Sequence, residues 1–179
     1  MKRVRYAVVG AGWISQIAFL PAVAQTDNSE VAAIVSGSVD AARKLADFHG
    51  IPEVVSYDEY DALLASDRID AVYIALPNSL HADYTIRALK AGKHVLVEKP
   101  LAPTVAECQA MIAASEASGA FLMTAYRLHH EPGTVEGTRV EARFARIGRL
   151  RRSRFGQANE LRGTGMGSTR PAPRTACWP

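Results

Sequence analysis

The sequence has few of the features that mark membrane proteins and disulfide-rich proteins. No apolar run in its 179 residues approaches the ~18 residues needed to cross a bilayer. Its two cysteines, Cys108 and Cys177, are far apart and form no CxxC pair, so neither a disulfide framework nor a zinc site is indicated. The start, MKRVRYAVVG, lacks the longer apolar region and the cleavage site of a signal peptide. We therefore predict a cytoplasmic protein with no metal site and no membrane partner.

Charge is distributed unevenly, although the net charge is only +3. Residues 1–136 carry 11 basic and 16 acidic residues, whereas residues 137–179 carry ten arginines, no lysine and two acidic residues. The last 24 residues contain no Ile, Val or Phe, and such a composition cannot bury enough apolar area to become ordered. We therefore predict a globular domain at residues 1–128, followed at 129–179 by an irregular, largely disordered, arginine-rich tail.

The first 125 residues alternate between apolar, β-branched runs and segments with helical spacing. Strands are expected at 4–9, 31–35, 69–76, 94–98 and 121–125, with a short edge strand at 54–55. Helices are expected at 13–25, 39–49, 59–65, 79–91 and 105–118, and Pro21 is expected to kink or end the first of them. Continuous apolar strands separated by helices predict an α/β fold, a doubly wound parallel-sheet Rossmann domain. Such sheets bind ligands at the carboxyl ends of their strands.

A glycine turn follows the first predicted strand. The stretch VVGAGWIS matches G-x-G-x-x-G except that Ser15 stands at the third position, which needs only a small residue for helix–strand packing. Gly10 would permit the tight turn, and Gly12 would let backbone N–H groups approach a pyrophosphate. The motif alone is a weak signal, but its place between a strand and a helix predicts a dinucleotide site.

The end of the second predicted strand bears on the choice of cofactor. NAD sites commonly place an acidic residue there for the ribose 2′-hydroxyl, whereas this chain has Ser36-Gly37-Ser38. Hydroxyl donors without a carboxylate suit a 2′-phosphate, and Arg43 and Lys44 follow closely in the sequence. We therefore predict NADP, with NAD as the alternative. A solvated helix face is the other interpretation of Arg43 and Lys44.

The stretch AVYIALPNSLHADYTIRALKAGKHVLVEKPLAPTVAECQAMI resembles the Gfo/Idh/MocA family, which is named after glucose–fructose oxidoreductase and inositol dehydrogenase. It is especially similar to the NADP-dependent glucose–fructose oxidoreductase branch. The resemblance covers about residues 4–132, and Glu-Lys-Pro after P-N-x-x-H is its most specific part. It implies an NAD(P)-dependent oxidoreductase that transfers hydride to or from sugars, polyols and related compounds. For the full-length family it also implies a homo-oligomer and a C-terminal open-faced β-sheet domain that carries the substrate.

The resemblance implies a role for each matching residue. Lys99 would be the catalytic residue, which donates a hydrogen bond to the substrate oxygen and helps to move a proton as hydride moves. The branch usually has a lysine near Ala41, which this chain lacks, so Arg43 or Lys44 would have to replace it at the 2′-phosphate. The residues implied to hold the cofactor are Gly10, Gly12, Trp13 and Ile14 at the pyrophosphate; Ser36 at the 2′-phosphate, with Gly37 beside it; Tyr57 near the adenosine; Leu76, Pro77, Asn78 and His81 at the ribose and nicotinamide; and Glu98, Lys99 and Arg127 in the nicotinamide pocket.

The resemblance stops where the arginine-rich tail begins. A family member would be about twice as long and would contain a catalytic histidine in a D-x-G-x-H setting, which this sequence lacks. Three interpretations remain open: a truncated or out-of-frame reading of a longer gene, a short dinucleotide-binding or regulatory module without catalysis, and a basic-tailed polyanion-binding protein. The arginines of the tail would attract phosphates, but the tail lacks the interleaved aromatic residues of a protein that binds nucleic acid specifically. On the first interpretation we expect cofactor binding with negligible activity, because the wall that orients a sugar or polyol substrate is missing.

Overall fold

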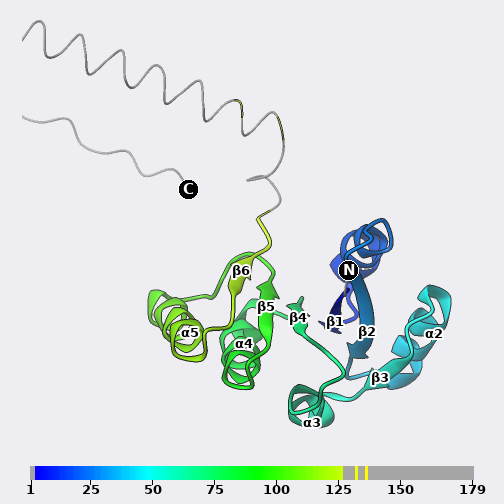
Figure 1. The fold of residues 1–179 in the computed structure, drawn as a ribbon, viewed down its shortest axis with the longest axis horizontal. Coiled ribbons are helices and arrows are strands. Elements are labelled where there is room, and N and C mark those ends of the chain that lie inside the picture. Colours follow the sequence, from blue (N-terminus) through cyan, green and yellow to red (C-terminus); the bar gives the residue numbers. More distant parts are fainter. Residues whose placement is uncertain (1–2, 127–131, 133–135, 137–179) are drawn as a thin grey trace, which may run out of the picture. The chain divides into compact units, whose positions relative to one another are not determined.

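One parallel sheet organises the described part of the chain, which in this computed structural model comprises residues 3–126, 132 and 136. Residues 3–126 belong to one compact unit. The strands are β1 (Val4–Val9), β2 (Ser29–Val35), β3 (Glu53–Val55), β4 (Ala71–Ile74), β5 (His94–Val97) and β6 (Leu122–Thr124). They lie in the order β3-β2-β1-β4-β5-β6, and every neighbouring pair is parallel (Figure 1).

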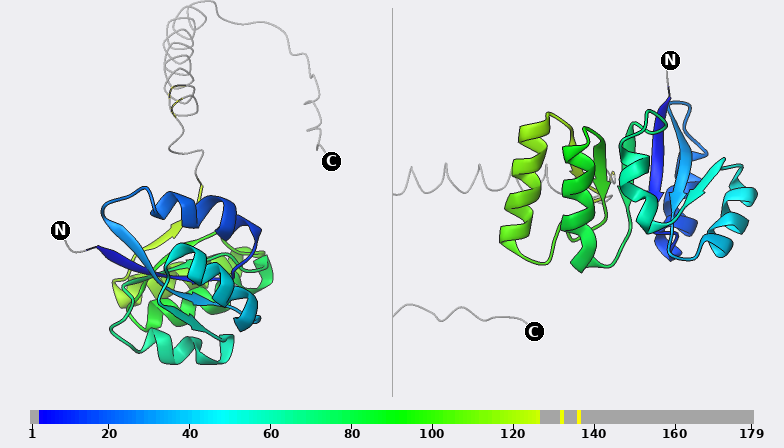
Figure 2. Two further views of the ribbon diagram at one scale, coloured as in Figure 1. Left: turned by 90° about the vertical axis from the view of Figure 1, so that its right-hand side faces the viewer. Right: turned by 90° about the horizontal axis from the view of Figure 1, so that it is seen from below.

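Helical segments connect these strands and cover both faces of the sheet. They are the π-helical η1 (Ser15–Phe19) and α1 (Leu20–Val23), α2 (Val39–His49), η2 (Tyr57–Glu59) and α3 (Tyr60–Leu64), η3 (Asn78–Leu80) and α4 (His81–Lys90), and α5 (Val105–Ser118). The helices α3, α4 and α5 cover one face, while α1 and α2 cover the other (Figures 1 and 2). This arrangement confirms the predicted α/β class and its doubly wound parallel sheet.

Alternating side chains of the strands build a core on each face. Val8, Ile34 and Tyr73 pack with Leu20 of α1 and with the buried alanines of α2. Their sequence neighbours on β1, β2 and β4 point the opposite way and pack against α3, α4 and α5. Because successive side chains of a strand point to opposite faces, an uninterrupted apolar run fills both cores at once.

Element ends differ from the sequence-based boundaries in a few places. The helical spacing runs to about residue 25, with Pro21 expected to kink or end the helix, and the helix ends at Val23, two residues after this proline. Before that proline the chain takes the wider π-helical turn of η1, in which the Leu20 N–H donates to the Ser15 carbonyl. The strand expected at 69–76 is shorter at both ends, because its pairing with β5 begins at Ala71 and ends at Ile74.

Several predictions from the sequence lie outside the described residues. They concern Arg127, the tail at 129–179 apart from Pro132 and Glu136, and the domain boundary between 128 and 129. These stay predictions. Within the described part of the chain, no helix has both the length and the apolar character needed to cross a membrane.

Candidate functional site

A cavity of about 350 Å³ opens where the carboxyl ends of β1, β2 and β4 meet. The chain passes from β1 to β2 on one side and reaches β4 on the other, so strand order reverses at β1. In open α/β sheets this is the position where ligands bind. The cavity is lined by Gly10, Ala11, Gly12, Gln16, Ser36, Ser38, Ala41, Ala42, Leu45, Tyr57, Ala75, Leu76 and Pro77.

The glycine turn borders this cavity, and its glycines differ in their surroundings. Gly10 has φ +98°, and a Cβ there would stand 2.6 Å from the Ala75 carbonyl oxygen. The fully buried Ser15 donates its hydroxyl proton to the Gly10 carbonyl at 2.6 Å, so the residue at the third motif position ties the helix to the turn. A Cβ at Gly12 would meet nothing within 4 Å. The space over Gly12 is therefore open to a ligand.

The end of β2 supplies hydroxyl groups and an aromatic wall. The Ser36 hydroxyl accepts the Ser38 N–H at 3.2 Å, and both serines line the cavity. A Cβ on Gly37 would lie 3.2 Å from the Tyr57 ring, so the glycine lets this ring approach the turn. Burial raises the pKa of the Tyr57 phenol. The described residues that line the pocket include no carboxylate, so none of them would repel a phosphate.

Glu98 follows β5 and is held on two sides. The Tyr73 hydroxyl donates to its Oε1 at 2.7 Å, and the backbone N–H of Lys99 donates to its Oε2 at 3.2 Å. Burial, and next the hydrogen bond to Glu98, raise the pKa of Tyr73. Lys99 itself is exposed, and within the described part of the chain its ammonium makes no hydrogen bond or ion pair.

His81 lies in the wall between the β4 and β5 loops. It is 1% exposed, and its Nδ1 and Nε2 lie 2.8 Å from the Pro100 carbonyl oxygen and 2.9 Å from that of Leu76. A neutral imidazole has one N–H and can donate to only one of these oxygens. The ring is thus neither at the protein surface nor among the residues that line the cavity.

The structure gathers some of the predicted site residues around the cavity. Those that line it are Gly10, Gly12, Ser36, Tyr57, Leu76 and Pro77. Those that do not are Trp13, Ile14, Gly37, Arg43, Asn78, His81, Glu98 and Lys99, and Arg127 lies outside the described residues. Arg43 is exposed, and Trp13 is exposed by 73%. The cofactor contacts predicted for all of these residues stay predictions.

Other residues of the site were not predicted from the sequence. Gln16, one position after the glycine motif, lines the cavity and donates its side-chain amide to the Ala11 carbonyl at 2.8 Å. Leu45 also lines it, and its helical spacing from Ala41 and Ala42 was the signal available for it. Tyr73 is the partner of Glu98, and only the register between β4 and β5 reveals that contact.

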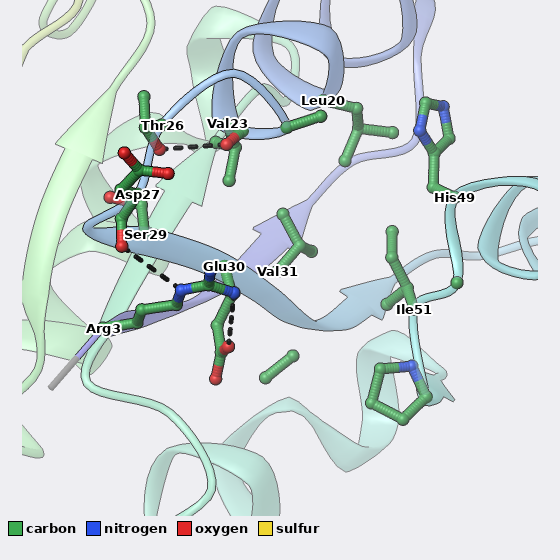
Figure 3. A pocket seen from close by; sticks show the side chains of 14 residues that line it. Arg3, Leu20, Val23, Thr26, Asp27, Ser29, Glu30, Val31, His49 and Ile51 are labelled. Atoms are coloured by element: carbon green, nitrogen blue, oxygen red, sulfur yellow. Dashed lines mark hydrogen bonds and ion pairs between the residues drawn. The ribbon is translucent and has the colours of Figure 1, made fainter.

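A second cavity, of about 490 Å³, lies at the opposite edge of the sheet, beside the amino-terminal end of β2 (Figure 3). Two of its charged side chains already interact with each other, because Arg3 lies 3.9 Å from the Glu30 carboxylate and also donates to the Asp27 backbone carbonyl at 3.2 Å. None of the predicted site residues lines it. The cavity at the strand carboxyl ends is therefore the candidate site.

Known proteins share this arrangement. The model of the Gfo/Idh/MocA family, an oxidoreductase family with an NAD-binding Rossmann fold, matches residues 4–126. The NADP⁺-dependent D-xylose 1-dehydrogenase of Haloarcula marismortui is 38% identical over 130 residues, which are 72% of this chain and 36% of that protein.

Solved structures agree with the sequence relatives. The aldose-aldose oxidoreductase of Caulobacter crescentus, solved with glycerol, superposes with a TM-score of 0.74 at 37% identity, over 79% of this chain and 43% of that one. A 3-ketoreductase of Actinomadura kijaniata, solved with TDP-benzene and NADP, gives a TM-score of 0.73 at 34% identity, over 79% and 44%. The chain thus spans less than half the length of these relatives.

Proposed function

Because the chain belongs to the Gfo/Idh/MocA oxidoreductase family, whose members have an NAD-binding Rossmann fold, we propose that its sheet-edge cavity binds NADP(H). The proposed reaction is hydride transfer between the nicotinamide and a sugar or polyol. The observation that carries the proposal is the cavity at the strand-order reversal, which is bordered by an open glycine turn and whose described lining residues include no carboxylate. The NADP⁺ dependence of the similar xylose dehydrogenase and the NADP bound in the 3-ketoreductase structure support the same choice.

The residues present fit a dinucleotide. The space over Gly12 admits a pyrophosphate, because a Cβ placed there would meet no neighbouring atom within 4 Å. Ser36 and Ser38 offer hydroxyls at the position where a 2′-phosphate would lie, and Tyr57 offers an aromatic face for the adenosine. When bound, the dinucleotide would supply the hydride donor or acceptor.

Lys99 is the proposed catalytic residue. The residue follows the carboxyl end of β5, next to β4, whose end borders the cavity, and its ammonium has no partner within the described part of the chain. It can therefore donate a hydrogen bond to a substrate oxygen and exchange a proton with it. Glu98, Asn78 and His81 would shape the nicotinamide side of the same edge.

Titration of dihydronicotinamide fluorescence tests the cofactor proposal. We expect the chain to bind NADPH more tightly than NADH. A Ser36→Asp variant should weaken NADPH binding by at least about tenfold, because a carboxylate would face the 2′-phosphate. Ser29→Asp places the same charge at the other end of β2 and serves as the matched control. Equal affinity of the wild type for both cofactors would remove the NADP preference, and binding of neither would remove the site.

A further inference from the structure

Tyr73 and Glu98 meet because β4 and β5 run in register. Tyr73 pairs with Leu96, and side chains alternate along a strand, so Glu98 points to the same face of the sheet as Tyr73. The hydroxyl of Tyr73 then reaches Glu98 Oε1 at 2.7 Å. A hydroxyl that donates to a carboxylate makes a charge-assisted bond, which is roughly twice as strong as one between neutral groups.

The Tyr73 ring is itself held in place. It is 2% exposed and stacks on Phe19, with ring centroids 3.8 Å apart and an angle of 4° between the planes. Phe19 in turn meets the edge of Tyr6 at 5.6 Å. Since Phe19 is the last residue of η1, the stack connects the helix that follows the glycine turn with the end of β5. The ring is thus held between its neighbours with its hydroxyl donating to Glu98.

We infer that Tyr73 is a positioning residue, whose hydroxyl fixes the Glu98 carboxylate and, through its other oxygen, the Lys99 backbone N–H. The inference rests on the proposed function for one step, that the nicotinamide half of the cofactor lies along this edge. Each carboxylate oxygen accepts more than one hydrogen bond, so Glu98 keeps acceptor capacity for a ligand amide or hydroxyl after it has bound Tyr73. Within the Glu98-Lys99-Pro100 motif, the Lys99 backbone N–H donates to this carboxylate at 3.2 Å. Tyr73 is its donor from outside the motif, and Glu98 itself is partly exposed just after a strand end.

A double-mutant cycle on NADPH affinity tests the inference. Tyr73→Phe keeps the ring and its stack on Phe19 but removes the hydroxyl, and Glu98→Ala removes the acceptor. We expect Tyr73→Phe to raise the dissociation constant about three- to tenfold, as loss of one hydrogen bond would. In the Glu98→Ala background the same change should have little further effect, because Tyr73 acts through Glu98.

The matched control is Tyr60→Phe. Tyr60 is equally buried, and its hydroxyl donates to the Tyr84 carbonyl at 3.1 Å on the other face of the sheet. This variant should lose similar stability and keep wild-type affinity for NADPH. If Tyr73→Phe binds NADPH as Tyr60→Phe does, or if its effect adds in full to that of Glu98→Ala, the inference is overturned.

Failure of the proposed function gives a different pattern. If the wild type binds no NADPH, the proposed cofactor site is wrong. The Tyr73–Glu98 contact is then tested in the protein without a cofactor. The same double-mutant cycle is then measured on the free energy of unfolding in urea. A coupling between Tyr73→Phe and Glu98→Ala that exceeds the error of the measurement supports the contact, because the hydroxyl and the carboxylate then stabilise the fold through each other. Fully additive effects of the two substitutions overturn it.

Discussion

The two glycines of the turn carry different constraints. Alanine at Gly10 would bring a Cβ within 2.6 Å of the Ala75 carbonyl oxygen, at a φ of +98° that side chains rarely adopt. Alanine at Gly12 would place its Cβ in open space. We therefore predict that Gly10→Ala lowers the free energy of unfolding by several kcal/mol, about 2–4 by analogy with other strained positions. Gly12→Ala should change it by less than about 1 kcal/mol.

For Gly12→Ala, the expected effect is on cofactor affinity and not on stability. Gly12→Ala should fold normally and bind NADPH at least about tenfold more weakly, because its methyl group occupies the space proposed for the pyrophosphate. Urea unfolding and NADPH titration on the same preparations measure both quantities. Wild-type affinity in a folded Gly12→Ala variant would contradict the placement of the pyrophosphate.

Single residues of the site were predictable where their partners are close in the sequence. Gly10 and Ser15 belong to one motif, and Ser36 follows directly from the end of its strand. Tyr73 and His81 were not predictable as contacts, because their partners Glu98 and Pro100 are 25 and 19 residues away. The sequence pattern shows that both strands end near one edge, but only the register shows which side chains meet there.

At the scale of elements, α5 shows how local signals define a helix. Thr104 accepts the Glu107 N–H at 3.2 Å, and Glu107 accepts the Thr104 N–H at 3.0 Å, which is a capping box. Gly119 follows the last helical residue with φ +71°. Both signals lie in the sequence, and the predicted bounds of 105 to 118 agree with the structure. The π turn of η1 has no such signal, because helical apolar spacing does not distinguish a π turn from an α turn.

The capping box leads to a prediction for stability. Thr104→Ala should lower the free energy of unfolding by about 1 kcal/mol, because it leaves the Glu107 N–H without its acceptor. Thr104→Ser keeps the hydroxyl and should retain most of the stability. Thermal unfolding of the three proteins, followed by circular dichroism, measures the difference as a shift of a few degrees. Equal loss in the serine and alanine variants would show that the methyl group of Thr104, not the cap, stabilises the helix.

The whole molecule carries a buried tyrosine on each face of its sheet, Tyr60 with α3 and Tyr73 opposite α1. Burial is the main cause that raises the pKa of both phenols above the ordinary value of 10.0. The folded state therefore keeps these protons at a pH where the unfolded state loses them. Their contribution to stability is fully present below pH 10.0 and is lost as the pH rises above it.

Alkaline unfolding should follow from this linkage. Above pH 10.0 the free energy of unfolding should fall by up to about 1.4 kcal/mol per pH unit for each of the two tyrosines. Tyr60→Phe removes one of these groups. The slope of the free energy of unfolding against pH should therefore decrease by the contribution of one tyrosine. Leu63→Val, a buried neighbour with no ionisable group, should lower stability equally at all pH values and serves as the control. Urea unfolding at several pH values on either side of 10.0 measures the slopes. A Tyr60→Phe slope equal to that of the wild type would mean that the phenol ionises alike in the folded and unfolded chains, and that the sheet does not exclude water from it.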